Sequence, residues 1–349
     1  MQYKRHVKWM IPGILTFSMY TSASNAGAPG AGGDLYVSSQ DLGAVLQYDG
    51  VTGDYVGVFA SGLDTPSGLV FRDNGNLLVV SGNAIIEFDN NGGFLGMLTS
   101  ISEGQRDLEW GPDGALYVAS GSFGVQRYDA QTGAFLGTFT SGVPLPAAWG
   151  IAFGGPNQNL YVTDSDLDQV LEFDGVTGVF VGVVGGTGGL LSSGCEFGPN
   201  GNLFVSAVIG NVVEYDVSTN VPVSVYPSGS AVDLTFHPVS NNLLVPEFTN
   251  LSNIVEHDTN IVQSLGPFAT GAGHPRGAAF KPVPGLTGDM NCDGLIDGAD
   301  VGPFVIAILD PDLYEAQYSG CQIENGDVND DSQTDPGDIA LFVSLLLAP

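Results

Sequence analysis

The sequence predicts a mainly β protein, a six-bladed propeller followed by a small α-helical module. Two observations predict it. A strand-like phrase recurs six times at intervals near 40 residues, and residues 286–349 hold two acidic loops that each lead into an apolar segment. Gly 51 and Pro 20 are abundant, but 43% of the residues are hydrophobic and 10% aromatic, so the chain is neither collagen-like nor disordered.

The repeated phrase places an apolar triplet after a small or polar residue. Its leucines are at positions 35, 77, 116, 160, 203 and 243, which gives successive spacings of 42, 39, 44, 43 and 40. Each phrase leads to a second strand such as residues 45–49, a Thr-Gly or Asn-Gly turn, and a third strand such as residues 55–59. A Gly/Pro loop then leads to a fourth, as in residues 68–71. Four short strands in about 40 residues is the pattern of a propeller blade.

The order of the phrases also predicts how the ring closes. The chain begins on the second strand of a blade and ends, at Phe280, on a first strand. We expect the last strand to complete the blade that the first phrase opens, because this pairing leaves no exposed edge. Residues 33–281 resemble six-bladed propellers of the NHL-repeat type, in which Gly-Leu-x-Phe is the innermost strand. That architecture hosts lyases, lactonases and binding modules, so the resemblance implies a fold and not a function.

The N-terminus predicts export. Lys4, Arg5 and Lys8 precede an apolar run over residues 9–20, and small residues follow up to residue 26. We interpret residues 1–26 as a secretory signal peptide, because the run is too short for a lasting membrane span; an uncleaved anchor is the alternative. The protein is therefore expected to be extracellular or on the cell surface, with no membrane span after signal removal. The net charge of −30 argues against a nucleic-acid partner, since little could neutralise phosphates.

A second domain is expected over residues 288–349, after a linker at residues 282–287. No Lys or Arg occurs from Leu286 to Pro349, and two loops there carry regularly spaced oxygen side chains. Oxygens at positions one, three, five, nine and twelve, with a backbone carbonyl at seven, surround a hard cation. The expected ligands of two calcium ions are Asp289, Asn291, Asp293, Leu295, Asp297 and Asp300 in the first loop, and Asp327, Asn329, Asp331, Gln333, Asp335 and Asp338 in the second.

Paired loops closed by Asp, each leading into an apolar helix (residues 301–309 and 339–347), resemble a type I dockerin. The resemblance implies a calcium-folded module that docks on a cohesin-like extracellular protein, with a role near polysaccharide breakdown. The sequence departs from the dockerin pattern in two places. Ser332 replaces the Gly at position six of the second loop, which predicts weaker binding there. Positions ten and eleven, which set cohesin choice, are Gly298-Ala299 and Pro336-Gly337, which weakens the prediction of a cellulosomal partner.

The cysteine positions agree with export. We expect Cys292, inside the first loop, to pair with Cys321, between the two apolar segments, because so small a module needs a staple. Cys195, on an innermost strand, is interpreted as a buried core residue rather than a nucleophile.

The loops before the innermost strands should ring one mouth of the propeller channel. They contribute the candidate ligand-binding residues Arg106, Asp107, Trp149, Asp233 and Arg276, with Glu109 and Glu196 farther into their strands. Such a set suits a polar ligand such as a carbohydrate. The alternative is structural: the aspartates bond backbone amides and the arginines pair with them.

Function is left between three hypotheses. The first is a secreted calcium-binding adapter, with the propeller as recognition domain. The second is an enzyme, a lyase or lactonase-like hydrolase, with Asp107, Asp233 and His274 as catalytic candidates; no metal-ligand or nucleophile motif accompanies them. The third is a structural propeller at the cell surface whose tail contacts its own domain.

Overall fold

The structure, a computed structural model, describes residues 33–72, 74–101, 106–248, 253–281, 287–292, 296, 298–318, 321–329 and 333–347. The predicted signal peptide, residues 282–286 of the predicted linker, and four of the expected calcium ligands (Asp293, Leu295, Asp297 and Asp331) lie outside them. No described helix is long and apolar enough to cross a membrane.

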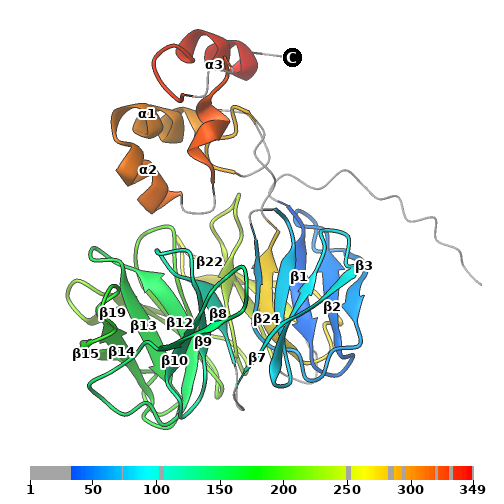
Figure 1. The fold of residues 1–349 in the computed structure, drawn as a ribbon, viewed down its shortest axis with the longest axis vertical. Coiled ribbons are helices and arrows are strands. Elements are labelled where there is room, and N and C mark those ends of the chain that lie inside the picture. Colours follow the sequence, from blue (N-terminus) through cyan, green and yellow to red (C-terminus); the bar gives the residue numbers. More distant parts are fainter. Residues whose placement is uncertain are drawn as a thin grey trace, which may run out of the picture.

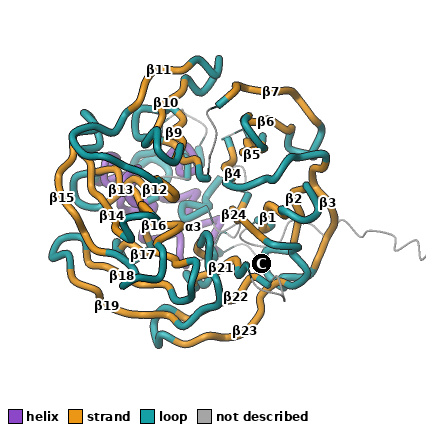
Figure 2. Tube along the Cα trace, turned by 90° about the horizontal axis from the view of Figure 1, so that it is seen from below, coloured by secondary structure: helices purple, strands orange, loops and turns teal. Residues whose placement is uncertain are grey.

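Six four-stranded antiparallel sheets surround a central axis, which confirms the predicted mainly β six-bladed propeller (Figures 1 and 2). Blades one to three consist of β4(Leu69–Phe71), β5(Leu77–Ser81), β6(Ala84–Phe88), β7(Phe94–Ser100); β8(Leu108–Trp110), β9(Leu116–Ala119), β10(Val125–Tyr128), β11(Phe135–Thr138); β12(Ala148–Gly154), β13(Asn159–Asp164), β14(Gln169–Phe173), β15(Phe180–Gly185). Blades four and five consist of β16(Ser192–Phe197), β17(Leu203–Ala207), β18(Val212–Asp216), β19(Val221–Tyr226); β20(Thr235–Phe236), β21(Leu243–Pro246), β22(Ile254–Asp258), β23(Gln263–Ala269).

The sixth blade joins the two ends of the propeller, as expected. Its strand order is β24(Pro275–Phe280), β1(Leu35–Ser39), β2(Ala44–Tyr48), β3(Tyr55–Ser61). β24 pairs antiparallel with β1, with Leu35 opposite Phe280 and Val37 opposite Ala278. The pairing leaves neither strand as an unpaired edge and holds the ring together across the full length of the propeller sequence.

Aspartates stabilise the turn between the third and fourth strand of each blade. In blade three, one carboxylate oxygen of Asp174 accepts hydrogen bonds from the amides of Val176 and Thr177 and from the Thr177 hydroxyl. Equivalent bonds are made by Asp49, Asp89, Asp129, Asp216 and Asp258. Such Asx turns explain why an acidic residue precedes each turn, so part of the chain's acidity is structural.

Leucines of the repeated phrase and aromatic residues form the cores between blades. Leu35, Leu77, Leu116, Leu160, Leu203 and Leu243 are all fully buried. The last apolar position of the next strand is aromatic in five blades (Tyr48, Phe88, Tyr128, Phe173 and Tyr215) and is His257 in blade five.

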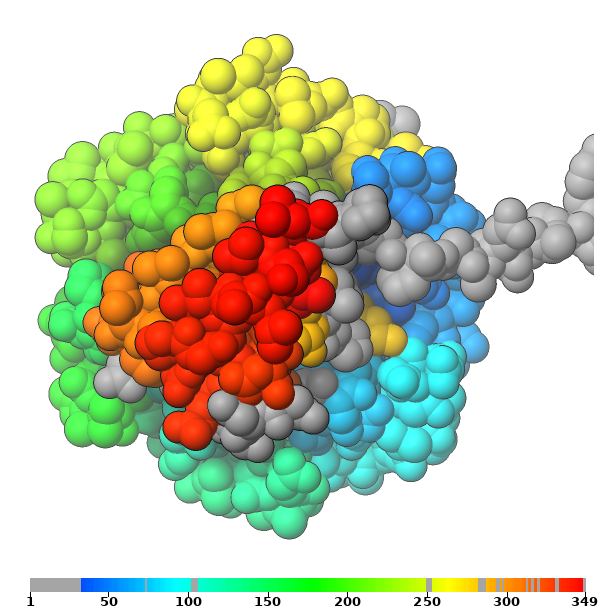
Figure 3. Space-filling view, turned by 90° about the horizontal axis from the view of Figure 1, so that it is seen from above, coloured from blue at the N-terminus to red at the C-terminus, as the bar shows by residue number. Residues whose placement is uncertain are grey.

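Residues after the linker form a separate small cluster of helices: α1(Val301–Leu309), α2(Pro311–Gln317), α3(Ile339–Leu346) and the 3-10 turns η1(Gly298–Asp300) and η2(Ile323–Gly326). Figures 1 and 3 show them beside one face of the propeller. Their buried core includes Met290 and Tyr314, and the rings of Phe304 and Phe342 stack 3.9 Å apart between α1 and α3. The two helices predicted from the apolar segments are therefore present, and α2 is an addition that the sequence analysis did not foresee.

Candidate functional site

The inner strands of the propeller are aligned so that one position of each faces the axis at the same level. That level is occupied by Gly68, Asp107, Gly150, Gly194, Asp233 and Gly277, one from each blade. A Cβ atom added to Gly68 would meet the Cα of Asp107 at 2.8 Å, and one added to Gly194 would meet the Cα of Asp233 at 2.7 Å. The inner strands therefore approach so closely that glycine is required beside each aspartate.

Asp107 and Asp233 accept hydrogen bonds from the backbone of the following blade. Asp107 accepts from the amides of Leu108 and Ile151, and Asp233 accepts from that of Ala278. This part of the structural alternative is confirmed: both aspartates hold neighbouring inner strands together. The other part is wrong, because no ion pair joins Arg106 or Arg276 to any described carboxylate.

Two glutamates extend this ring of acids along the channel. Glu109 and Glu196 lie two residues beyond the axial position of their strands, so strand alternation points them to the same side as Asp107 and Gly194. We call Asp107, Glu109, Glu196 and Asp233 the channel acids. Each of these side chains is partly exposed to the channel and is otherwise enclosed by protein.

Burial in the channel disfavours the charged forms of the channel acids. Burial raises the pKa of Glu109 to about 7, with a further contribution from the nearby Asp233. Burial and then the neighbouring acids raise the pKa of Glu196 well above its usual range. For the interacting pair Asp107 and Asp233 the pKa of each is raised, chiefly by burial. The channel acids can therefore hold protons at neutral pH.

Arg106, Trp149 and Arg276 meet at the channel mouth, the end at which the inner strands begin. They line one cavity of about 330 Å³, with Gln40, Asp64, Thr65, Pro66, Ser67, Val80, Gly82, Asn83 and Val232. The Arg106 guanidinium lies over the Trp149 ring at 4.5 Å, and that of Arg276 over Phe248 at 4.2 Å. The predicted convergence of these three residues is confirmed; Phe248 and Gln40 were not foreseen, because they lie in the β21–β22 and β1–β2 loops and not in the loops before the innermost strands.

His274 lies near this mouth but is held by its neighbours. Its Nδ1 is 2.6 Å from Asp41, and its ring packs on Phe248. Its backbone has φ 50°, as Thr65 has φ 42° at the equivalent place before a proline. These features indicate that His274 fills a loop position.

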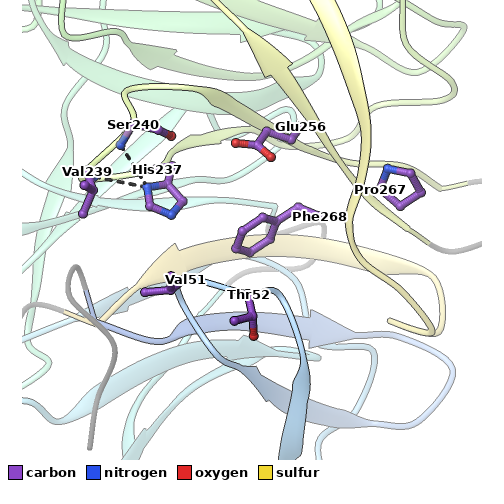
Figure 4. Close-up of a pocket in the computed structure, with 8 residues that line it drawn as sticks. All are labelled: Val51, Thr52, His237, Val239, Ser240, Glu256, Pro267 and Phe268. Carbon is purple, nitrogen blue, oxygen red and sulfur yellow. Dashed lines mark hydrogen bonds between the residues drawn. The ribbon is translucent and has the colours of Figure 1, made fainter.

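A second cavity, of about 410 Å³, lies between blades five and six, on the side of the β2–β3 turn (Figure 4). His237 lines it, yet both of its ring nitrogens are engaged. Nδ1 accepts from the amides of Val239 and Ser240, so Nε2 carries the proton and donates to the Gly50 carbonyl at 2.7 Å. His237 thus joins blade five to the closing blade and has no nitrogen left for proton transfer.

The two acidic loops share a repeated arrangement. Asp300 accepts hydrogen bonds through one oxygen from the amides of Met290 and Asn291, and Asp338 does so from those of Val328 and Asn329. Each closing aspartate therefore bonds positions two and three of its own loop. Asp289 is 1% exposed, and Asp300 and Asp338 are fully buried.

The donors that the structure describes in these loops fit a hard cation. They are carboxylate and amide oxygens, the groups that calcium prefers, in a segment that lacks Lys, Arg and His altogether. Buried carboxylates are costly without a compensating positive charge. Among the described residues no group of three or more acidic, His or Cys side chains is arranged to hold a metal, and the remaining expected ligands lie outside them.

The disulfide prediction is confirmed. Cys292 and Cys321 are bonded and lie 29 positions apart in sequence. Cys195 is unpaired and buried in the core of blades three and four, where burial raises the pKa of its thiol. A protonated, enclosed thiol agrees with the interpretation of Cys195 as a core residue.

Comparisons with known proteins support the propeller fold alone. No protein-family model matches the chain, and no curated protein does. A crystal structure of a protein of unknown function from Bacteroides caccae is 15% identical, with a TM-score of 0.57, and the match covers 70% of this chain and 97% of that one. A nidogen/laminin complex is 14% identical, with a TM-score of 0.61, over 72% of this chain and 98% of that one. Virginiamycin B lyase from Staphylococcus aureus is 16% identical, with a TM-score of 0.44, and the match covers 56% of this chain and 67% of that one.

Proposed function

We propose that this is an exported adapter protein. Its propeller binds a polar extracellular ligand, a carbohydrate, at the channel mouth, and its C-terminal dockerin-like module binds two calcium ions and docks on a cohesin-like protein. The observation that carries the proposal is the direction of β24. Arg276 at its start lies at the mouth, whereas Phe280 at its end leads to the C-terminal helices. A ligand site that faces away from the tether stays accessible after docking.

The surface of the helical module supports docking. α1 and α3 expose apolar side chains although the module is small: Val301, Val305, Leu309, Ile339, Leu341 and Val343. Apolar residues gathered on two neighbouring helices are typical of a protein interface.

A calcium titration of the full chain without residues 1–26 tests the module. We expect calorimetry to find two sites, one lost in Asp300→Asn and the other in Asp338→Asn, with the second loop the weaker because of Ser332. Asp258→Asn, at a half-buried turn aspartate of the propeller, is the charge-matched control and should keep both sites. Cohesin domains should then bind only in calcium, and not to the double variant. Two sites that persist in both loop variants would place the cations elsewhere and contradict the proposal.

One observation favours an enzyme as the second candidate. A carboxyl group such as Glu109, with a pKa near 7, is suited to general acid or base catalysis, and it lies below a cavity lined by two arginines. A lyase or lactonase-like hydrolase would require the channel acids for turnover. If Asp107→Asn, Asp233→Asn, Glu109→Gln and His274→Ala all leave turnover of a substrate unchanged, this site is not catalytic.

A further inference from the structure

We propose that the channel mouth binds a carboxylate-bearing ligand, a uronic-acid sugar, through Arg106 and Arg276. This inference rests on the proposed carbohydrate recognition and specifies its chemical class. It begins from the use that the protein makes of its few basic residues.

Outside residues 1–32 the chain has only five Lys and Arg residues. Three of them have structural partners. Arg72 pairs with Glu87 at 3.1 Å, Arg127 pairs with Asp113, and the Lys281 ammonium donates to the Asn90 carbonyl at 2.7 Å. In a protein with net charge −30, each of these three cationic side chains therefore bonds another part of the propeller.

The remaining two meet at the mouth. Arg106 and Arg276 come from blades two and six, 170 positions apart, and both line the 330 Å³ cavity. Each lies over an aromatic ring, and the Nε of Arg276 donates to Gln40 at 2.7 Å. No ion pair to either guanidinium occurs among the described residues.

Two unpaired cations side by side are electrostatically unfavourable. Burial and the proximity of Arg106 lower the pKa of Arg276. Among the described residues, Asp64, exposed on the β3–β4 loop, is the one carboxylate that lines the cavity, and it forms no ion pair with either arginine. The channel acids beneath the mouth tend to be protonated, which reduces their competition with an incoming anion. An anion bound between the guanidinium groups would relieve the repulsion between them.

The shape and chemistry of the mouth favour a sugar acid over a bare ion. A guanidinium group presents paired donors that match a carboxylate. The cavity volume falls within the range of about 300–1,000 Å³ common for small-molecule sites. Trp149, Gln40 and Asn83 add an aromatic surface and neutral hydrogen-bonding groups, which suit the hydroxylated ring that carries the carboxylate.

Uronate trisaccharides and their methyl esters test the inference, because esterification removes the charge and leaves the sugar. The probes are galacturonate, glucuronate and mannuronate trisaccharides, titrated by calorimetry into the full chain without residues 1–26. We expect one acid form to bind and its ester to bind at least tenfold more weakly. Arg106→Gln and Arg276→Gln should each weaken the acid at least tenfold. The control Arg127→Gln removes the same charge from blade two, away from the mouth, and should change nothing.

The outcomes separate this inference from the proposed function. Equal binding of acid and ester, unchanged in both mouth variants, would overturn the anion site and leave carbohydrate recognition standing. Binding of none of the uronates would also overturn it, while calcium binding and docking are decided by their own titration. Unfolding temperatures of the variants close to that of the parent chain show that a loss of binding is not a loss of the fold.

Discussion

Asp107 and Asp233 occupy the same place in blades two and five, three blades apart around the ring. Each accepts a hydrogen bond from the residue that follows the axial glycine of the next inner strand, Ile151 for the first and Ala278 for the second. Each also packs against the glycine of the preceding blade, Gly68 and Gly194. The channel thus repeats its inner pattern after half a turn, and two aspartates face each other where the four other blades have glycine.

Replacing either aspartate by Asn should stabilise the protein at alkaline pH. The folded pKa of each is raised above the unfolded value of 3.8, so its favourable contribution is complete below that value and is lost as pH rises through the folded pKa. The Asn side chain keeps an oxygen that can accept the hydrogen bond from the backbone amide, and it carries no charge. We expect Asp107→Asn and Asp233→Asn to gain about 1–3 kcal/mol at pH 8 and nothing at pH 4, since one pKa unit corresponds to about 1.4 kcal/mol.

Denaturant unfolding at the two pH values measures this difference. Asp174→Asn is the control, because hydrogen bonds from its turn lower the pKa of Asp174 and its charge is favourable. It should show no gain at pH 8. Asparagine variants at 107 and 233 that are less stable than the parent at pH 8 would contradict the assignment of buried, proton-holding acids.

His257→Phe should stabilise blade five, most of all in acid. Neither ring nitrogen of the fully buried His257 has a hydrogen-bond partner, and the equivalent residue is Phe or Tyr in the other blades. Burial lowers the pKa of His257 below its ordinary 6.5, so stability is lost as pH falls below that value and the unfolded chain takes up a proton. Removing an unsatisfied buried polar group is worth about 1–3 kcal/mol.

Unfolding temperatures at pH 5 and pH 8 test this prediction, with a larger gain expected at pH 5. The matched variant is His237→Phe, which removes the bonds to Gly50, Val239 and Ser240 and should lower stability at both pH values. Equal effects of the two substitutions would show that the two buried histidines do not differ as described.

Gly194→Ala should destabilise the propeller by about 1–3 kcal/mol, because its methyl group would lie 2.7 Å from the Cα of Asp233 and an inner strand would have to move. Gly182→Ala in the outer strand β15 is the control: nothing lies within 4 Å of its Cβ. That variant should be neutral or slightly stabilised. Comparable losses in the two variants, measured by urea unfolding, would show that the inner ring is not tightly packed.

Reduction of the disulfide should weaken the helical module and leave the propeller folded. Closing a loop of 29 residues stabilises a fold by about 3–4 kcal/mol in the chain-entropy account. Alkylation in denaturant without reductant should label one thiol, that of Cys195, and three after reduction. Circular dichroism should show a loss of helix without a loss of strand. Three labelled thiols before reduction would contradict the pairing.

The blade pattern was predictable because it is local. Each Leu-centred phrase, its turn aspartate and its glycines lie within about 40 residues, and alternation decides which side chains enter the core. Closure of the ring by Phe280 and Leu35 followed from counting strands. The convergence of Arg106, Trp149 and Arg276 followed from their equivalent places before the inner strands. Phe248 under Arg276 could not be predicted, because it lies in the β21–β22 loop and not in one of the loops before the inner strands.

By itself the sequence determined the six repeats and their closure, since spacing and turn chemistry carry that information. It also determined the pairing of Cys292 with Cys321, since these are the two cysteines of a module too small to rely on its core. Only the tertiary structure decided how the few charged and polar groups in the interior are used. In the structure Arg106 and Arg276 lie over aromatic rings and do not pair with Asp107 and Asp233. His237 donates a hydrogen bond to the Gly50 carbonyl. These choices depend on contacts between blades far apart in sequence, and such contacts exist only after the ring has closed.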